Sequence, residues 1–281
     1  MPKHYRIECM TRDEVKLAIE WAAREGWNPG LHDADYFYQT DPSGFFAGKL
    51  DGKIIAVGSA VRYDEFFAFC GLYIVDEHYR GQDYGLELTQ KRLAYIGSRN
   101  AGIDGVVTML DKYERLGYKI AHSNARYSGK VIKTSARSSA IFPLTKNHFA
   151  SLVDYDSHHF PAPRAHFLKC WINQPKGASL GYFQDKQLCG YGVLRPCRKG
   201  FKIGPLFANN EKIADELFLA LVNHAQEGPI FLDIPENNSH ALALVKRYQL
   251  EKVFETARMY LKGEPKLPID EIYGITTFEL G

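Results

Sequence analysis

A weak internal repeat constrains the fold of this 281-residue chain more than any other feature of its sequence. The matched positions keep the same order in both halves: Gly58 with Gly192, Gly71 with Gly204, Asp104 with Asp233, Arg115 with Arg247, and Ala125-Arg126 with Ala257-Arg258. Their separations lie between 129 and 134 residues, and the second copy is about four residues shorter between its Gly71 and Asp104 equivalents. Self-similarity at a fixed spacing indicates related structural units. We therefore expect two domains, at residues 1–134 and 135–281.

Composition excludes several classes of protein. The chain is 45% hydrophobic and 24% charged, close to the average of globular domains. No stretch approaches the ~20 apolar residues of a membrane span, and the first residues lack the apolar core of a secretory signal. The net charge of +2 does not point to a nucleic-acid partner. We expect a cytoplasmic protein without membrane or nucleic-acid partners.

Cysteine spacing argues against a structural framework of disulfides or zinc. The five cysteines are widely separated and form no C-x-x-C pair. His158-His159 has no cysteine or carboxylate at the spacing of a metal site, so we expect packing or solvated histidines and no metal. Cys70 stands just before an apolar strand and is expected to be a buried thiol rather than a nucleophile.

Hydrophobic periodicity and turn residues predict a mixed α+β chain. Thr11 and Glu14 form a capping-box pattern that begins a helix ending near Arg24. The other expected elements of the first half are strands at 44–50, 53–63 and 66–75 and a helix at 85–99. Those of the second half are strands at 179–183, 188–194 and 201–207 and a helix at 211–224. Residues near 130–145 are small and polar, and Lys130–Lys133 is interpreted as a solvated linker.

The segment 71–88 carries the clearest chemistry. It predicts a strand, a short loop and the start of a helix. Gly81 and Gly85 allow a close approach of the loop backbone to a ligand. Free N–H groups at the start of a helix form an anion site, to which Arg80 adds charge. The segment is therefore suited to hold a pyrophosphate.

Two motifs in this part of the chain resemble the GNAT (general N-acetyltransferase) superfamily. Arg80–Gly85 is similar to that family's acetyl-CoA loop, [QR]-x-x-G-x-[GA], except that Asp83 stands where the middle glycine is expected. Tyr113-Glu-Arg-Leu-Gly-Tyr resembles the family's Y-[EQ]-[KR]-x-G-[FY] signature. A carboxylate beside a pyrophosphate is repulsive, which puts the affinity for CoA, though not the fold, in question. The resemblance covers nearly the whole chain and extends to a tandem subfamily with two such domains.

The resemblance implies an acetyl-CoA-dependent N-acetyltransferase with a mixed, mostly antiparallel sheet flanked by helices in each domain. It assigns binding of acetyl-CoA to Tyr73, Ile74, Val75, Arg80, Gly81, Gln82, Asp83, Tyr84 and Gly85. Tyr113 would protonate the departing thiolate, since a phenol with a pKa of about 10 carries its proton at neutral pH. The acceptor would be the amine of a small molecule, and a homodimer is compatible with the sequence.

The base that would deprotonate the acceptor is left open. Asp33, Asp64, Asp76, Glu77 and a chain of water molecules are all candidates. Residues proposed to line the acceptor pocket are Trp27, Asn28, Asp33, Asp156 and Arg164. Asp156 and Arg164 either face a cleft between the domains or pair with each other, and the segment from Trp27 to Asp33 is equally compatible with a capping loop.

The repeat also predicts an asymmetry between the two halves. Tyr113 falls on Val245 and Gly117 on Gln249, and the segment Asn209-Asn-Glu-Lys-Ile carries no glycine. We therefore expect one active N-terminal half and a degenerate C-terminal half that shapes the acceptor cleft. The alternative is a non-catalytic GNAT-fold scaffold or ligand sensor in which Asp83 has weakened CoA binding. A third interpretation is transfer of a longer acyl chain.

Overall fold

The computed structural model describes residues 4–130, 133 and 138–281. The first half of the chain consists of β1 (Tyr5–Cys9), α1 (Arg12–Arg24), α2 (Asp33–Thr40), β2 (Phe45–Leu50), β3 (Lys53–Arg62), β4 (Phe67–Val75), α3 (Tyr84–Ile96), β5 (Asn100–Val106), α4 (Leu110–Arg115) and β6 (Lys119–Gly129). The second half consists of β7 (Ile141–Pro143), α5 (Phe149–His159), α6 (Ala165–Trp171), β8 (Ala178–Gln184), β9 (Gln187–Pro196), β10 (Phe201–Ala208), α7 (Glu211–His224), β11 (Ile230–Pro235), α8 (Ser239–Arg247), β12 (Glu251–Tyr260) and β13 (Ile272–Gly274). Four single-turn 3₁₀ segments connect these elements.

Local sequence signals explain the first helix well. The Thr11 hydroxyl accepts a hydrogen bond from the N–H of Glu14, and the Glu14 carboxylate accepts one from the N–H of Thr11. This is the predicted capping box, which satisfies two amide groups that a helix start leaves free. The apolar face buries Val15 and Ile19 in a core to which both halves of the chain contribute. Burial of these side chains stabilises the helix more than its intrinsic propensity does.

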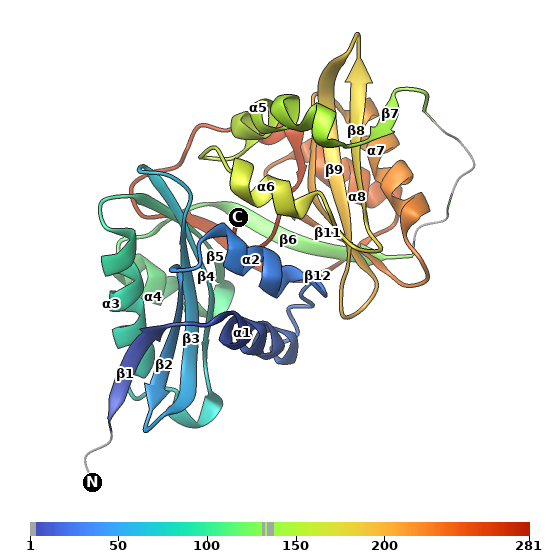
Figure 1. The fold of residues 1–281 in the computed structure, drawn as a ribbon. Coiled ribbons are helices and arrows are strands. Elements are labelled where there is room, and N and C mark those ends of the chain that lie inside the picture. The colour runs from blue at the N-terminus through green and yellow to red at the C-terminus, as the bar shows by residue number, and fades with distance from the viewer. Residues whose placement is uncertain (1–3, 131–132, 134–137) are drawn as a thin grey trace.

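All the described strands join one sheet in the order β1-β2-β3-β4-β5-β12-β6-β11-β10-β9-β8-β7, with β13 paired to β10. Most neighbours are antiparallel, and helices flank the sheet, as predicted (Figure 1). The order contains an exchange that the sequence did not predict. Strand β12 of the second half lies between β5 and β6, and β6 of the first half lies between β12 and β11. The two halves therefore share a continuous sheet.

Two strand pairs of this sheet diverge after a few residues. β4 pairs in parallel with β5 only over Phe67–Phe69 and 100–102, and β10 pairs in the same way with β11 over 201–203 and 230–232. These two pairs are equivalent in the repeat. Beyond the divergence in the second half, β13 pairs with β10 at Leu206 and Phe207. The second gap is thereby filled by a strand. Among the described residues, no strand pairs with β4 on its β5 side beyond Phe69.

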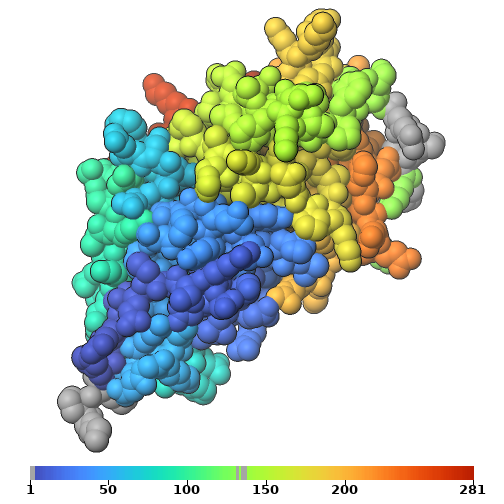
Figure 2. Space-filling model, viewed as in Figure 1, coloured from blue at the N-terminus to red at the C-terminus, as the bar shows by residue number. Residues whose placement is uncertain are grey.

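The two halves of the chain also contact each other through their helices. In the space-filling view, the α1–α2 region in blue adjoins the α5–α6 region in yellow-green across the middle of the visible face (Figure 2). Phe37 of α2 stacks on Trp171 of α6 with ring centroids 6.2 Å apart. The segment 275–281, which ends the chain near the centre of Figure 1, is buried where the two halves of the chain meet.

Most predicted elements agree with the structure within one to three residues. The largest error is the end of the second predicted helix, which was placed at Arg99. α3 ends at Ile96 because Gly97 follows with φ +62°, in the left-handed region that interrupts a helix. The expected domain boundary between 134 and 135 lies outside the described residues. None of the described helices has the length and apolar character of a membrane span.

Candidate active site

A hollow of about 550 Å³ opens where β4 and β5 diverge. Its walls come from β4 (Cys70–Tyr73), β5, α3 and α4, and β12 of the second half contributes Phe254 and Thr256. Trp27, which precedes α2, and the segment 278–279 complete the lining. The hollow is therefore built by both halves of the chain.

An irregularity in β4 forms the floor of this hollow. Leu72 has φ +46°, and the pairing of β3 with β4 shifts register between Val57 and Ser59. The Gly71 N–H donates to the Ser59 hydroxyl at 3.1 Å. Arg92 fixes the distortion, because its Nε donates to the Ser59 carbonyl at 2.8 Å and its Nη2 to the Gly71 carbonyl at 3.3 Å. Bulges of this kind redirect backbone groups at the edge of a sheet.

Tyr113 lines the same hollow from α4. Its ring packs against the backbone of β5 so closely that a Cβ at Gly105 would lie 2.9 Å from Cδ2. Tyr118 contacts the ring edge-on, with centroids 6.4 Å apart. Burial raises the pKa of Tyr113 above its ordinary value of 10. The hydroxyl therefore carries its proton at neutral pH.

The loop 80–85 leads from β4 into α3 and presents free backbone N–H groups. Gly81 has φ +76° and Asp83 φ +62°. No backbone carbonyl among the described residues accepts a hydrogen bond from the N–H groups of 81–85, and the Asp83 side chain makes no capping bond. Asp83 thus occupies a conformation that favours glycine, at the position where the family motif has glycine. The exposed helix start is suited to an anion.

Arg80 lies beside this loop but is engaged by other groups. Its Nη2 donates to the Glu25 carboxylate at 2.7 Å, and its Nε donates to the Val75 carbonyl at 2.8 Å. Gln82 donates from its amide to the His78 carbonyl at 3.1 Å. An anion at the loop would therefore meet the backbone amides first, with Arg80 as a neighbouring charge already shared with Glu25.

Gly85 permits a close contact between α3 and β4. A Cβ at this position would lie 2.1 Å from the Tyr73 hydroxyl oxygen and 3.0 Å from Cγ2 of Val75. The Tyr84 carbonyl accepts a hydrogen bond from the Tyr5 hydroxyl at 2.9 Å, which ties the first turn to β1. The predicted residues Tyr73, Val75, Tyr84 and Gly85 are thus brought together at the start of α3. Ile74 is buried in the core that both halves share.

The residues predicted for the acceptor pocket separate in space. Trp27 lines the hollow. Asn28 instead makes two hydrogen bonds with the backbone of Lys199, at 3.1 and 2.9 Å. Asp33 is buried and accepts a hydrogen bond from the Gly30 N–H at 2.7 Å and from Arg195 Nε at 3.2 Å.

Asp156 and Arg164, the other two residues predicted for the acceptor pocket, pair with each other. Both side chains are fully buried, and two hydrogen bonds of 2.8 Å join them. The Tyr191 hydroxyl donates to the same carboxylate. Of the two alternatives that the sequence left open, the structure shows the internal pair.

The other side chains considered from the sequence have structural partners. Burial raises the pKa of the Cys70 thiol, so Cys70 is a poor nucleophile. Both ring nitrogens of His159 have oxygen partners, the Tyr155 carbonyl and Glu271. Among the described residues, no group of three or more His, Cys, Asp or Glu side chains is arranged to hold a metal ion.

Three of the candidate bases occupy turns outside the hollow. Asp64 accepts hydrogen bonds from the N–H groups of Phe66 and Phe67, and Asp76 from that of His78. Glu77 is exposed beside the His78 ring. Sequence reasoning missed Glu279, which lines the hollow, because no motif and no repeat partner marks it.

The equivalent positions of the second half differ from those of the first. The Asn210 side chain accepts a hydrogen bond from the Ile213 N–H at 3.1 Å and so caps α7, the counterpart of α3. Val245, the counterpart of Tyr113, is buried in the core. β13 fills the gap between β10 and β11. An open helix start, a tyrosine and an unfilled gap therefore occur together in the first half.

Comparisons with known proteins agree with this architecture. A model described as the acetyltransferase (GNAT) family matches residues 13–118, and one described as an acetyltransferase (GNAT) domain matches residues 152–274. A protein of Pseudoalteromonas sp. (strain SANK 73390), holothin acyltransferase, is 27% identical over 270 residues, which cover 96% of this chain and 92% of that protein.

Solved structures show the same fold over the whole chain. A putative acetyltransferase from Pyrococcus horikoshii has a TM-score of 0.83 at 19% identity, covering 99% of this chain and 96% of the other. A tandem GNAT protein from the clavulanic acid biosynthesis pathway has a TM-score of 0.65 at 11% identity, covering 94% and 100%. The similarity thus extends across both halves and includes a protein described as a tandem.

Proposed function

Because this chain belongs to the GNAT superfamily and carries two GNAT domains in tandem, we propose that it transfers an acetyl group from acetyl-CoA to the amine of a small-molecule acceptor. The observation that carries the proposal is the position of Tyr113. Tyr113 and the irregular stretch of β4 at Gly71–Tyr73 line one hollow, so a residue that can supply a proton and redirected backbone groups border the same space. The name of the Pseudoalteromonas relative supports acyl transfer.

The residues of the first half fit acetyl-CoA. The N–H groups of 81–85 form a cradle for its pyrophosphate, and the absence of a side chain at Gly85 keeps that cradle against β4. Beyond Phe69, β4 presents a strand edge that β5 does not pair with, along which an extended pantetheine arm fits. Acetyl-CoA supplies the activated acetyl group, and the chain contributes binding, orientation and protons.

Each residue then has a definite task in the reaction. Backbone amides at the β4 irregularity orient the thioester and stabilise negative charge on its oxygen. Tyr113 donates its hydroxyl proton to the sulfur as the bond between carbon and sulfur breaks. Holding both reactants in one hollow accounts for much of the acceleration, since positioning alone contributes several kcal/mol.

Thermal unfolding in the presence of acetyl-CoA tests the proposal. A ligand that binds only the folded state raises the melting temperature as its concentration exceeds the dissociation constant. We expect stabilisation by acetyl-CoA and release of free CoA when a primary amine is added. Comparing acetyl-CoA with octanoyl-CoA tests the acyl length, and a preference for octanoyl-CoA would replace acetyl transfer with transfer of a longer acyl chain.

A non-catalytic scaffold is the second candidate, and one observation favours it. The Asp83 carboxylate stands at the helix start where an anion would bind, and Glu25 already neutralises Arg80. Absence of a shift in melting temperature at millimolar acetyl-CoA would support the scaffold and contradict the transferase.

A further inference from the structure

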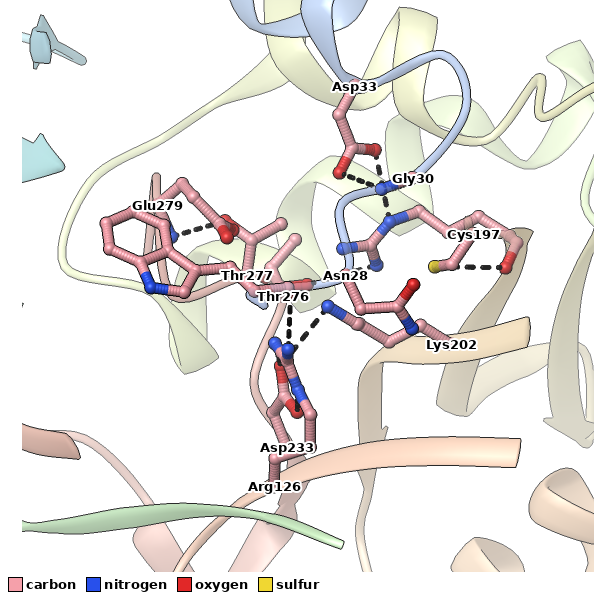
Figure 3. A network of polar contacts seen from close by, with 12 residues as sticks. Asn28, Gly30, Asp33, Arg126, Cys197, Lys202, Asp233, Thr276, Thr277 and Glu279 are labelled. Atoms are coloured by element: carbon pink, nitrogen blue, oxygen red, sulfur yellow. Dashed lines mark hydrogen bonds and ion pairs between the residues drawn. The ribbon is translucent and has the colours of Figure 1, made fainter. Parts of the chain in front are cut away.

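Arg92 of α3 is an exception among the buried arginines. Its residue is 5% exposed, and four other arginines of the described chain are buried as well. Each of those four pairs with an aspartate whose side chain is buried: Arg126 with Asp233 (Figure 3), Arg164 with Asp156, Arg195 with Asp33, and Arg258 with Asp104. Arg92 pairs with no carboxylate among the described residues and donates only to the backbone carbonyls of Ser59 and Gly71. An unpaired buried charge is costly to a fold.

The guanidinium of Arg92 lies at the wall of the hollow. Arg92 belongs to the lining, as do Gly71, whose carbonyl accepts from Nη2, and Tyr73, whose ring centroid lies 5.4 Å from Arg92 Cζ. Nη1 makes no hydrogen bond with a described residue but, unlike Nη2 of Arg195, is not enclosed by the protein. This nitrogen is therefore available to a group bound in the hollow.

Leucine takes the corresponding place in the second half. Gly58 of β3 leaves room for Arg92, because a Cβ there would lie 2.9 Å from Arg92 Cδ. Its repeat partner Gly192 of β9 leaves room for Leu221 of α7 in the same way, with 2.6 Å to Cδ1. Arg92 and Leu221 are 129 residues apart, within the range of the repeat. Since Leu221 is buried in an apolar core, the fold accepts an apolar side chain at this place.

The positive charge of Arg92 is thus not explained by folding. Replacing a buried charge by a well-packed apolar side chain is often neutral or stabilising, and the second half has such a side chain. The charge occurs in the half whose gap is unfilled. A negative charge that arrives in the hollow explains its presence there.

Acyl transfer creates such a negative charge. The proposed function puts the thioester at the β4 irregularity, which Arg92 contacts at the Gly71 carbonyl. The thioester is neutral when it binds, and its sulfur becomes negative as the bond between carbon and sulfur breaks. A fixed positive charge that meets its partner only at this stage stabilises the transition state more than the bound substrate.

The charge of Arg92 also acts on Tyr113. Burial raises the pKa of the Tyr113 hydroxyl, and the positive charge of Arg92 opposes this rise. Arg92 has the same effect on the pKa of Cys70, which burial raises and which lines the hollow too. A tyrosine that has given up its proton is negative, and a nearby cation favours this form. Arg92 is therefore placed to compensate negative charge before and after the proton transfer.

Resting on the acetyltransferase function above, we propose that Arg92 stabilises the negative charge that forms first on the departing sulfur and then on Tyr113. The electron pair of the acceptor's neutral amine forms the carbon–nitrogen bond. The carbon–sulfur bond breaks, and its electron pair stays on the sulfur, which takes the Tyr113 proton. A nitrogen proton then moves to the Tyr113 oxygen, so that an amide and the free thiol of CoA are the products.

The test compares binding of CoA with binding of desulfo-CoA, which lacks the sulfur, by calorimetry on the full chain between pH 6 and 9. The thiol of CoA loses its proton as the pH rises, and a nearby cation favours the thiolate. We expect the preference of the wild-type protein for CoA to increase at least fivefold over this range. A preference that does not change with pH would overturn the proposal whether or not any variant folds.

Variants of Arg92 separate its charge from its hydrogen bonds. Arg92→Met should abolish the increase with pH, and Arg92→Lys, which keeps the charge, should retain part of it. Loss of the support for β4 alone would weaken CoA and desulfo-CoA alike and leave the increase intact, which would overturn the proposal. Arg99→Met is the matched control, because Arg99 also donates to backbone carbonyls, those of Asp64 and Ile96, and does not line the hollow. It should match the wild type.

Two further measurements distinguish this proposal from other accounts. Binding of acetyl-CoA and CoA with an increase that Arg92→Met leaves unchanged would overturn the role of Arg92 and leave the transferase standing. If the wild type bound neither acetyl-CoA, CoA nor desulfo-CoA, the transferase would fail, and this proposal with it. A tenfold preference for succinyl-CoA over acetyl-CoA that Arg92→Met abolishes would assign Arg92 to a substrate carboxylate instead, which would also overturn the proposal.

Discussion

Arg126 of the first half forms a doubly hydrogen-bonded ion pair with Asp233 of the second, with Nε–Oδ1 at 2.6 Å and Nη2–Oδ2 at 2.7 Å. Arg258 of the second half forms the equivalent pair with Asp104 of the first, at 2.9 and 2.8 Å. Both pairs join residues that the repeat aligns, but each arginine bonds the aspartate of the other copy. The exchanged strands β6 and β12 place them there. The two halves are thus interlocked, and the hollow above β4 depends on this arrangement.

Removing one member of such a pair should destabilise the whole chain. Arg126→Met leaves Asp233 buried beside Lys202 alone, and breaking a buried pair typically costs about 3–5 kcal/mol. We expect one cooperative unfolding transition at lower denaturant concentration, measured by circular dichroism.

The double variant Arg126→Met/Asp233→Leu serves as the control, since it removes both charges. It should recover much of the loss, as apolar replacements of buried pairs often do. Two separate transitions in either variant would show that the halves unfold independently.

Replacing Tyr113 by phenylalanine should lower turnover and leave binding of acetyl-CoA nearly unchanged. The ring packing against Gly105 is retained, and only the proton donor is lost. General acids contribute factors of about 10²–10⁴ to rate. Steady-state kinetics together with calorimetry would separate the two effects. Tyr118→Phe is the matched control in the neighbouring ring, and an equal loss there would assign Tyr113 a packing role.

Adding a methyl group at Gly85 should weaken binding of acetyl-CoA. The new Cβ would lie 2.1 Å from the Tyr73 hydroxyl oxygen, so the start of α3 must move away from β4. In Gly85→Ala/Tyr73→Phe this oxygen is absent, and the nearest remaining atoms, Cγ2 of Val75 and Cζ of residue 73, lie at 3.0 and 3.2 Å. We expect partial recovery of affinity by calorimetry. Unchanged affinity in Gly85→Ala would argue against the loop as the phosphate cradle.

His122 of β6 should make stability depend on pH. Burial and the charge of Arg258 lower its pKa from 6.5 to about 4, although Glu264 Oε1, on a half-exposed side chain, lies 3.6 Å from Nδ1. The unfolded chain binds the proton first, so stability is highest above pH 6.5 and decreases as the pH falls towards 4. The shift corresponds to about 3 kcal/mol. Urea unfolding of His122→Gln should show a weaker dependence, while His166→Gln, at an exposed position, should match the wild type.

The sequence predicted much of the fold because its signals are local. The capping box of Thr11 and Glu14 and the glycine after α3 mark helix ends, and short apolar runs mark β2, β3 and β4. The exchange of β6 and β12 was not predictable in this way. Aligned repeats show that two segments are alike, but strand pairing depends on contacts between distant residues, which single-sequence periodicity does not contain.

The sequence predicted those residues of the candidate site that belong to recognisable motifs. Tyr113 and the loop 80–85 belong to patterns of fixed spacing. Glu279 follows no pattern, because its place beside the hollow depends on the fold bringing the segment 275–281 across β4. From the sequence, Asp156 and Arg164 are equally able to bind a ligand or to form an ion pair with each other. Their complete burial in the structure decides for the ion pair.

The account is tested most directly by the stoichiometry of acetyl-CoA binding to the intact chain. Separated halves are unsuitable, since each would lose a strand from the middle of the shared sheet. Isothermal titration calorimetry should give one site per chain, and Gly85→Ala should weaken that site. No binding would support the scaffold instead. Two sites per chain would contradict the asymmetry between the open first gap and the gap filled by β13.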